Sequence, residues 1–314
     1  MHQDINKSQV YDCFLFFNEL DLLEIRLNIL SETVDRFVLV EADRTFSNNP
    51  KPFYFEENRQ RYKHFLERII HIKIQQYPEI KTAWEMESYQ RNQIALGIEQ
   101  CLPNDIILIS DLDEIPNDKA VKNYIKSEKG ICALEQLHFD YYLNYQRCGK
   151  NDYWYNAKIL RYRDIVNNTL PPATPQDIRK NKGNKSIKEG GWHFSFLGGI
   201  QNIKYKIQSF SHQEWNNEKY LNDTIEYKIK MGIDLFDRKN IRLIPIRVSS
   251  KKYPRYILDN QEKYSHLIYP HIDHFIAIKN RLYCLPYYFY RLLVQVAKKV
   301  LPKGIIQKVK SRRK

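Results

Sequence analysis

IILISDLDEIPND, residues 106–118, joins an apolar run to a turn that carries three carboxylates within four residues. The run Ile106–Ile109 is typical of a short buried strand. Asp111, Asp113 and Glu114 follow it and would repel one another unless positive charge lies between them. In an extended turn, side chains two residues apart point to the same side, so the two aspartates converge. The stretch predicts a strand that ends in a charged ligand site, or in a solvated acidic turn that begins the next helix.

Carboxylates in this pattern are ligands for hard divalent cations. Mg²⁺ and Mn²⁺ prefer carboxylate and phosphate oxygens, so Asp111 and Asp113 are the predicted metal ligands. A bound cation would relieve the repulsion and leave positions open for a diphosphate. Phosphatases of the haloacid dehalogenase type also place Asp-x-Asp after an apolar strand, which makes them the minor alternative. They do so at the start of their fold, and with a small residue where Ile115 stands here.

Strand-like and helix-like segments alternate ahead of this stretch. Residues 10–17, 36–43 and 68–74 have the β-branched and aromatic content of buried strands. The predicted helices cover about residues 20–30, 56–68 and 82–101. This alternation predicts a mixed, mostly parallel sheet flanked by helices, in which ligands bind at the carboxyl ends of strands. Glu41 and Asp43 stand at such an end.

The second half of the chain is less regular. Residues 131–146 have the composition of strands, and residues 171–191 are polar and rich in Pro, Asn, Gly and Lys. We expect this polar stretch to be a long loop, which is either a lid over a bound substrate or a segment without fixed structure.

Two aromatic motifs follow the polar stretch. In GGWHFSFLGG, glycines let the backbone approach a ligand closely. Trp192 can then stack on a sugar, and His193 can bind metal, donate to phosphate or act as a base. The alternative is a core strand. In KIQSFSHQEWN, His212 is a candidate for metal or phosphate and Glu214 for the acceptor, unless the segment only caps a helix.

Composition limits the class of protein. The 314 residues are 43% hydrophobic, enough for one large domain with appendages or two small ones. The five cysteines lack metal-ligand spacing, so we expect reduced thiols with no zinc site or disulfides. No signal peptide or membrane-spanning run is recognisable, and a cytoplasmic protein is therefore expected.

Positive charge is concentrated at the end of the chain. Of the net charge of +13, eleven Lys or Arg and no Asp or Glu lie in residues 279–314, which leaves about +2 for residues 1–278. A body this close to neutral argues against a nucleic-acid partner. A helix with two faces is predicted from Phe289. Its apolar face carries Leu293, Val296 and Val300. Its opposite, polar face carries Arg291, Gln295, Lys298 and Lys299. With Tyr287, Tyr288 and Tyr290 beside it, this helix is expected to bind an anionic membrane surface on the cytoplasmic side, or else to pack on the body.

The ordered set of motifs resembles glycosyltransferase family 17, which includes β-1,4-mannosyl-glycoprotein 4-β-N-acetylglucosaminyltransferases. SDLDEIP and GGWHFS carry most of the resemblance, with Trp84, Arg91 and Asn92 before them. The resemblance extends over about residues 10–269. It implies a GT-A-like fold, with a catalytic domain over residues 1–278 (a nucleotide-binding half to about 120 and an acceptor half beyond) and a basic tail from 279.

The resemblance also implies an inverting transfer from a nucleotide sugar, UDP-N-acetylglucosamine in the known activity. Asp111 and Asp113 would hold Mn²⁺ or Mg²⁺ against the diphosphate. The candidates for the base that deprotonates the acceptor are Glu214, Glu114 and Glu189. Arg91, Glu41 and Asp43 would lie near the nucleoside, although Arg91 can also simply pair with Glu87 one helical turn away. Lys182, Lys185 and Lys188 would contact phosphates.

The chain differs from the animal members in lacking a recognisable N-terminal anchor. We therefore expect a glycan acceptor other than theirs, such as a lipid-linked or surface polysaccharide. A non-catalytic glycan- or nucleotide-binding module is the competing class of function.

Overall fold

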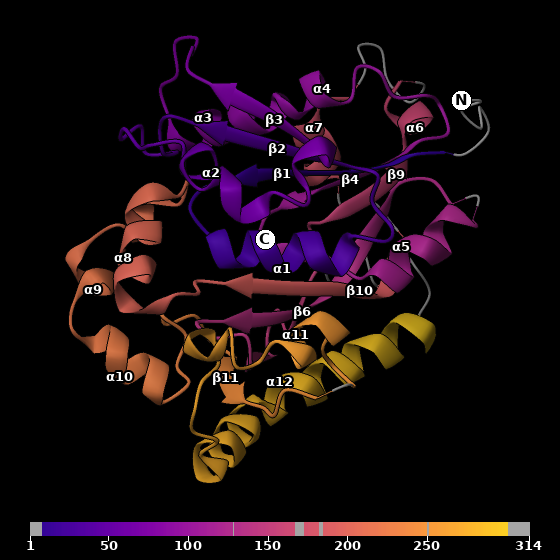
Figure 1. Ribbon diagram of the computed structural model, residues 1–314. Helices are drawn as coiled ribbons and strands as arrows, with labels where there is room; N and C mark the ends of the chain where they lie inside the picture. Colours follow the sequence, from indigo (N-terminus) through magenta and orange to yellow (C-terminus); the bar gives the residue numbers. More distant parts are fainter. Residues whose placement is uncertain (1–7, 128, 167–172, 182–184, 250, 301–314) are drawn as a thin grey trace.

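A computed structural model describes residues 8–127, 129–166, 173–181, 185–249 and 251–300 (Figure 1). In this part of the chain, eleven strands form one sheet. The strands are β1 (Val10–Phe16), β2 (Arg36–Ala42), β3 (Ile69–Ile74), β4 (Ile106–Asp111), β5 (Glu114–Pro116), β6 (Cys132–Asp140), β7 (Tyr145–Gly149), β8 (Tyr153–Trp154), β9 (Lys158–Arg161), β10 (Ser186–Ser195) and β11 (Ile241–Pro245). The α-helices are α1 (Leu20–Leu30), α2 (Tyr54–Glu57), α3 (Ala83–Asn92), α4 (Ile94–Gly97), α5 (Asp118–Ile125), α6 (Tyr162–Val166), α7 (Pro175–Lys180), α8 (Gly199–Ser209), α9 (Glu218–Leu221), α10 (Thr224–Lys230), α11 (Arg255–Asp259) and α12 (His274–Val300).

The first half of the sheet is parallel, as the alternation of segments predicted. Its order is β4-β1-β2-β3, and every pair in it is parallel. All residues of β1 are buried, because successive side chains pack into hydrophobic clusters on opposite faces. Phe14 joins the cluster that contains α1, and Cys13 joins the one that contains α4. The predicted helix over residues 82–101 is broken into α3 and α4, and the segment 56–68 forms only α2 and two 3₁₀ turns.

The second half of the sheet is mixed. β6 pairs in parallel with β10 and antiparallel with β7, β8 and β9, and β9 pairs antiparallel with β4. The sheet therefore crosses the predicted boundary near residue 120 without a break. The mixed α/β class, with a parallel block of strands on one side of the sheet and helices on its faces, is confirmed.

The long loop predicted over residues 171–191 is wrong for most of the residues described there. Residues 175–180 form α7, which begins at a capping box between Thr174 and Asp177 with Pro175 at its first position. Residues 186–195 form β10. Polar composition hid both elements: α7 is a short, strongly capped helix, and β10 is polar only in its first half.

The C-terminal helix α12 packs against β11 and β7 at the edge of the sheet opposite β3 (Figure 1). Its side chains Ala277, Asn280 and Cys284 are buried. The Sγ atom of Cys284 lies 3.2 Å from Sγ of Cys148 in β7, and both carry free thiols. The predicted boundary after residue 278 therefore falls inside a packed helix. Among the described helices, none is long and apolar enough to span a membrane.

Candidate active site

A cavity of about 990 Å³ opens where β1, β4, β6 and β10 end. Helices α3, α7 and α8 complete its wall. Among the described residues that line it, nine are Lys or Arg and five are Asp or Glu, so cations exceed anions by four. The cavity lies at the carboxyl ends of β1 and β4, the place expected for a ligand in an open α/β sheet. Its volume suits a ligand of nucleotide-sugar size.

The acidic turn at the floor of this cavity is held in place by Arg26 of α1. This fully buried guanidinium donates two hydrogen bonds to Asp12 of β1, at 2.8 and 2.6 Å, and one to Ser110 Oγ at 2.6 Å. It also donates to the main-chain carbonyls of Asp111, Leu112 and Glu114, at 2.8–3.1 Å. The carbonyls of the turn thus point at a buried cation, which leaves its carboxylates free to face the cavity.

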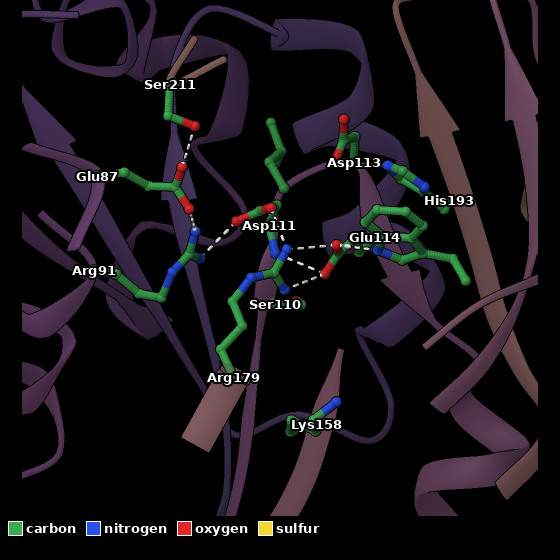
Figure 2. Close-up of polar contacts among 12 residues, drawn as sticks. Glu87, Arg91, Ser110, Asp111, Asp113, Glu114, Lys158, Arg179, His193 and Ser211 are labelled. Carbon is green, nitrogen blue, oxygen red and sulfur yellow. Dashed lines mark hydrogen bonds and ion pairs between the residues drawn. The ribbon is translucent and has the colours of Figure 1, made fainter. Parts of the chain in front are cut away.

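Two arginines neutralise Asp111 (Figure 2). Arg91 of α3 donates to its Oδ1 at 2.6 Å, and Arg179 of α7 pairs with its Oδ2. Arg91 is almost fully buried and also binds Glu87 at 2.7 Å, which in turn accepts from Ser211 Oγ at 2.5 Å. Burial would raise the pKa of Asp111, but Arg179 and Arg91 bring it below its ordinary value. The Glu87–Arg91 pair is therefore part of the cavity wall rather than a surface ion pair.

Glu114 is buried completely and has no free acceptor position. Arg179 donates to both of its carboxylate oxygens at 2.6 Å, and Trp154 Nε1 donates to Oε1 at 2.5 Å. The main-chain N–H of Asp111 donates to its other oxygen at 3.1 Å. A carboxylate bound in this way positions the turn and Arg179. A general base needs an accessible lone pair, so the geometry gives no support to the predicted role of Glu114 as a base.

Asp113 faces the cavity beside a lysine and a histidine. Lys206 of α8 donates to its Oδ2 at 2.8 Å, and His193 Nε2 lies 3.5 Å from its Oδ1. Burial would raise the pKa of Asp113, but Lys206 and His193 hold it well below the ordinary range. Lys206 also donates to Glu19 at 3.1 Å. Asp113 is thus ionised, and it is the second carboxylate at the floor of the cavity.

The two strongest sequence motifs pair directly with each other. β10 runs antiparallel to β5, with His193 opposite Glu114, and the N–H of Phe194 donates to the carbonyl of Asp113 at 2.8 Å. Alternation along β10 sends His193 into the cavity and the side chain of Trp192 into the core, where its Nε1 donates to the carbonyl of Lys252. The prediction that Trp192 stacks on a sugar is therefore wrong.

The glycines of this motif serve strand packing, not ligand approach. Gly191 has φ +143°, and a Cβ atom there would lie 2.1 Å from the carbonyl oxygen of Ile115. A Cβ at Gly190 would lie 2.7 Å from the main-chain nitrogen of Glu135 in β6. Only glycine lets β10 fit between β5 and β6 at this point.

Beside Asp113, two histidines and a tryptophan form a ring cluster. The His193 ring lies 4.4 Å from that of His138 and 4.6 Å from that of Trp154, between centroids. Burial lowers the pKa of His138 to about 3, with Arg147 adding to the effect. His193 Nδ1 and His138 Nε2 are buried without a hydrogen-bond partner in the protein. Both histidine rings line the cavity.

Glu41 and Asp43, the two carboxylates predicted near the nucleoside, lie outside the cavity lining. Glu41 is buried outside the cavity lining, where it accepts from the N–H of Phe55 and contacts His71 and Lys51. Asp43 accepts from Tyr77 and does not line the cavity. The adjacent residues Arg44, Thr45 and Phe46 line the cavity instead.

Two of the predicted bases, and the lid lysines that the structure describes, also lie outside the cavity lining. His212 lines the cavity, and its Nδ1 lies 2.6 Å from Oε1 of Glu214, an exposed side chain that is not among the lining residues. Glu189 and Lys188 are exposed on β10 outside the cavity lining, as is Lys185 just before it. Lys182 lies outside the described residues.

A metal ion would have to use few protein ligands here. Among the described residues, no group of three or more His, Cys, Asp or Glu side chains is arranged to hold one. Mg²⁺ bound with a nucleotide commonly takes only one or two carboxylates, and phosphates supply other ligands. Asp111 and Asp113, both ionised at the cavity floor, fit that donor set, and His193 lies beside Asp113. The predicted ligand His212 belongs to a separate part of the wall.

Three cations at the centre of the site were absent from the sequence prediction. Arg179 lies in the stretch that we expected to be a loop. Lys206 on α8 is the first residue of KIQSFSHQEWN, but no role was predicted for it. Arg26 did carry a signal, because it falls on the apolar face of α1, four residues after Leu22 and four before Leu30. A charge at such a position is buried and must be paired.

Comparisons with known proteins identify the family of the chain. The chain matches the family described as Glycosyltransferase family 17 over residues 2–272, and it belongs to that family. Two curated relatives, the β-1,4-mannosyl-glycoprotein 4-β-N-acetylglucosaminyltransferases of Rattus norvegicus and Homo sapiens, are 21% identical over 292 residues. The alignments cover 80% of this chain and 53% of each relative, so the chain spans about half their length.

A solved structure also matches part of the chain. It is the mannosyltransferase PcManGT from Pyrobaculum calidifontis in complex with GDP-Man and Mn²⁺, with a TM-score of 0.38 and 10% identity. The match covers 65% of this chain and 61% of that one. The family match confirms the resemblance carried by SDLDEIP and GGWHFS, and it leaves a phosphatase of the haloacid dehalogenase type without support.

Proposed function

We propose that this protein transfers a sugar with inversion from a nucleotide donor to a glycan hydroxyl. The observation that carries the proposal is the cavity at the strand ends, whose lining has four more cations than anions. Such a lining attracts a polyanion the size of a nucleoside diphosphate sugar. The names of the curated relatives support N-acetylglucosamine as the sugar, and UDP-N-acetylglucosamine as the donor follows from the family resemblance.

Within this proposal, Asp111 and Asp113 would hold Mn²⁺ or Mg²⁺ with the donor diphosphate, and the metal would supply Lewis-acid assistance to the departing nucleotide. The chain itself contributes Arg91, Arg179 and Lys206. They are already placed around these carboxylates and can turn toward phosphate oxygens. Arg179 pairs with both Asp111 and Glu114, and these two pairs fix its position relative to the acidic turn.

For the base, we propose Glu214 among the three predicted carboxylates. Its side chain is exposed, and the two nearby residues His212 and Trp215 line the cavity, with His212 hydrogen bonded to it. Glu214→Gln should lower transfer to an acceptor by about 100-fold or more, in the range for loss of a general base. Donor binding should persist. Glu189→Gln, at an exposed position of β10 outside the cavity lining, is the matched control and should transfer normally.

Turnover of nucleotide sugars tests the whole proposal. Wild-type protein incubated with UDP-N-acetylglucosamine and other nucleotide sugars should release nucleotide with Mn²⁺ or Mg²⁺, and chelation should stop the release. Asp113→Asn should abolish turnover while the protein remains folded, whereas Asp259→Asn, which changes an exposed carboxylate on α11, should leave turnover intact.

Each alternative has its own outcome in this experiment. Binding of a nucleotide sugar without turnover of any donor, with or without an added glycan acceptor, would favour the non-catalytic module. Full turnover after chelation would contradict the metal, and Arg91, Arg179 and Lys206 would then neutralise the diphosphate alone. Lipid-linked acceptors belong in the acceptor screen, because the expected product is a lipid-linked or surface polysaccharide.

A further inference from the structure

Helix α12 presents a continuous apolar stripe to solvent. Its members follow one another at alternating intervals of three and four residues: Phe275, Ile278, Leu282, Leu285, Phe289, Leu292 and Val296. Their exposed fractions run from 50% to 75%. Spacing of this kind places them on one face of a helix. Soluble monomers rarely expose a contiguous apolar surface of this extent, and such a surface marks a site of interaction.

The orientation of the stripe is fixed by the opposite face of the helix. Asn280 Nδ2 donates to the carbonyls of Met231 and Leu243, and Arg291 donates to the carboxylate of Asp152. The hydroxyl of Tyr288 accepts from the N–H of Gly149. Arg291 and Tyr288, which the sequence suggested as part of a membrane-facing surface, thus anchor the helix to the sheet. The stripe faces away from the body.

Basic side chains border the stripe. Lys279 and Arg281 are exposed, and on a helix of 3.6 residues per turn they fall on either side of the apolar face. Helix α12 contains no Asp or Glu. In the sequence, eleven Lys or Arg and no acidic residue lie from Lys279 to Lys314. The partner of this surface must therefore accept apolar side chains and carry negative charge.

Two kinds of occupant could cover an apolar stripe with this spacing. A second copy of the chain could form a coiled coil, because the stripe has the heptad pattern of such a seam. Lys279 and Arg281 would then flank the seam, and two identical helices without acidic residues would bring only like charges together. An anionic bilayer offers both an apolar layer and negative headgroups, so the charge favours it.

We propose that the outer face of α12 docks this protein in the interface of an anionic lipid bilayer. The stripe inserts among the acyl chains near the headgroups, and Lys279 and Arg281 contact headgroup phosphates. The helix lies along the surface, in agreement with the absence of a spanning helix among the described residues. The charge favours the cytoplasmic leaflet, where anionic lipids concentrate. This inference is independent of the donor and metal proposed above.

Vesicle binding by the full chain tests the proposal. Wild-type protein should sediment with phosphatidylcholine vesicles that contain phosphatidylserine, and much less with phosphatidylcholine alone. Leu282→Glu/Phe289→Glu should remove the bound fraction. Its matched control, Leu96→Glu/Leu102→Glu, changes two equally exposed leucines elsewhere and should bind as wild type.

The electrostatic part has its own variants. Lys279→Glu/Arg281→Glu should weaken partitioning by about tenfold or more, since each basic residue near an anionic surface contributes on the order of 1 kcal/mol. Lys63→Glu/Lys230→Glu makes the same charge change on exposed lysines elsewhere and should have a smaller effect. Raising the salt concentration from about 0.1 M to about 1 M should weaken binding of the wild type.

Three results would overturn the proposal: no sedimentation with anionic vesicles, equal binding to neutral ones, or unchanged binding by Leu282→Glu/Phe289→Glu. A dimer in analytical ultracentrifugation that this variant dissolves, without vesicle binding by the wild type, would assign the stripe to a second copy. Turnover of a soluble donor should be unchanged in every α12 variant, so the membrane proposal and the enzymatic proposal can fail separately.

Discussion

At the scale of single residues, the acidic turn is stable because each of its carboxylates is paired with at least one cation. Asp111 is bound by Arg91 and Arg179, Glu114 by Arg179, and Asp113 by Lys206. Removing Arg179 would leave Glu114 as an unpaired buried charge, which costs about 3–5 kcal/mol. These cations also provide positive charge at the place where a donor diphosphate would bind. The same groups therefore stabilise the apo turn and prepare the site for an anion.

Lys158 gives the cavity a pH dependence that can be measured. It lines the cavity, and burial lowers its pKa to about 8, with Arg179 adding to the effect. Below that pH the side chain is cationic, and it loses its charge as the pH rises through 8. We expect the KM for the donor to rise between pH 7 and 9, because the neutral amine attracts phosphate less.

Two substitutions at this position separate charge from packing. Lys158→Arg keeps its charge over this range and should flatten the pH profile of KM. Lys158→Met should raise KM about tenfold at neutral pH, which is the loss expected for one charge-assisted hydrogen bond. A pH profile of Lys158→Met that matches that of the wild type would show that another group titrates.

At the scale of elements, the site depends on a strand crossing that only glycine allows. Gly191→Ala places a Cβ against the carbonyl of Ile115 at a positive φ, and should destabilise the fold by about 1–3 kcal/mol. Because β10 also holds Asp113 through Phe194, turnover should fall as well. Chemical denaturation and donor turnover would measure the two effects.

Gly130→Ala is the control for this change. No atom lies within 4 Å of a Cβ atom built there, so stability and turnover should be those of the wild type. Normal turnover by Gly191→Ala would show that the β5–β10 contact does not position Asp113.

The parts of the site predicted from sequence are those encoded by local patterns. An apolar run followed by Asp111 and Asp113 identifies a strand end, and one helical turn joins Glu87 to Arg91. Arg179 and Lys206 were not predictable in this way, because they reach the turn from segments 68 and 93 residues away in sequence. Trp192 was misassigned for a similar reason. Its side of β10 became known only once β5 and β6 had been placed on either side.

At the scale of the whole molecule, α12 is both part of the core and a surface of its own. Its inner face, with Ala277 and Cys284, covers Cys148 and Ile244 at the β11 edge of the sheet. Its outer face is the apolar stripe. A basic tail that began at residue 279 without packing on the sheet would have only the exposed apolar stripe. The difference between these two arrangements can be measured through Asn280.

Asn280→Ala should destabilise the whole protein. The buried amide donates to the carbonyls of Met231 and Leu243, at 3.0 and 2.9 Å, and its loss leaves both without that partner. We expect the free energy of unfolding to fall by about 1–3 kcal/mol, the usual cost of unsatisfied buried polar groups. Gln295→Ala, on an exposed position of the same helix, should change it little. Urea denaturation of both variants decides the question. Equal stabilities would mean that α12 folds apart from the sheet, and would restore the predicted boundary after residue 278.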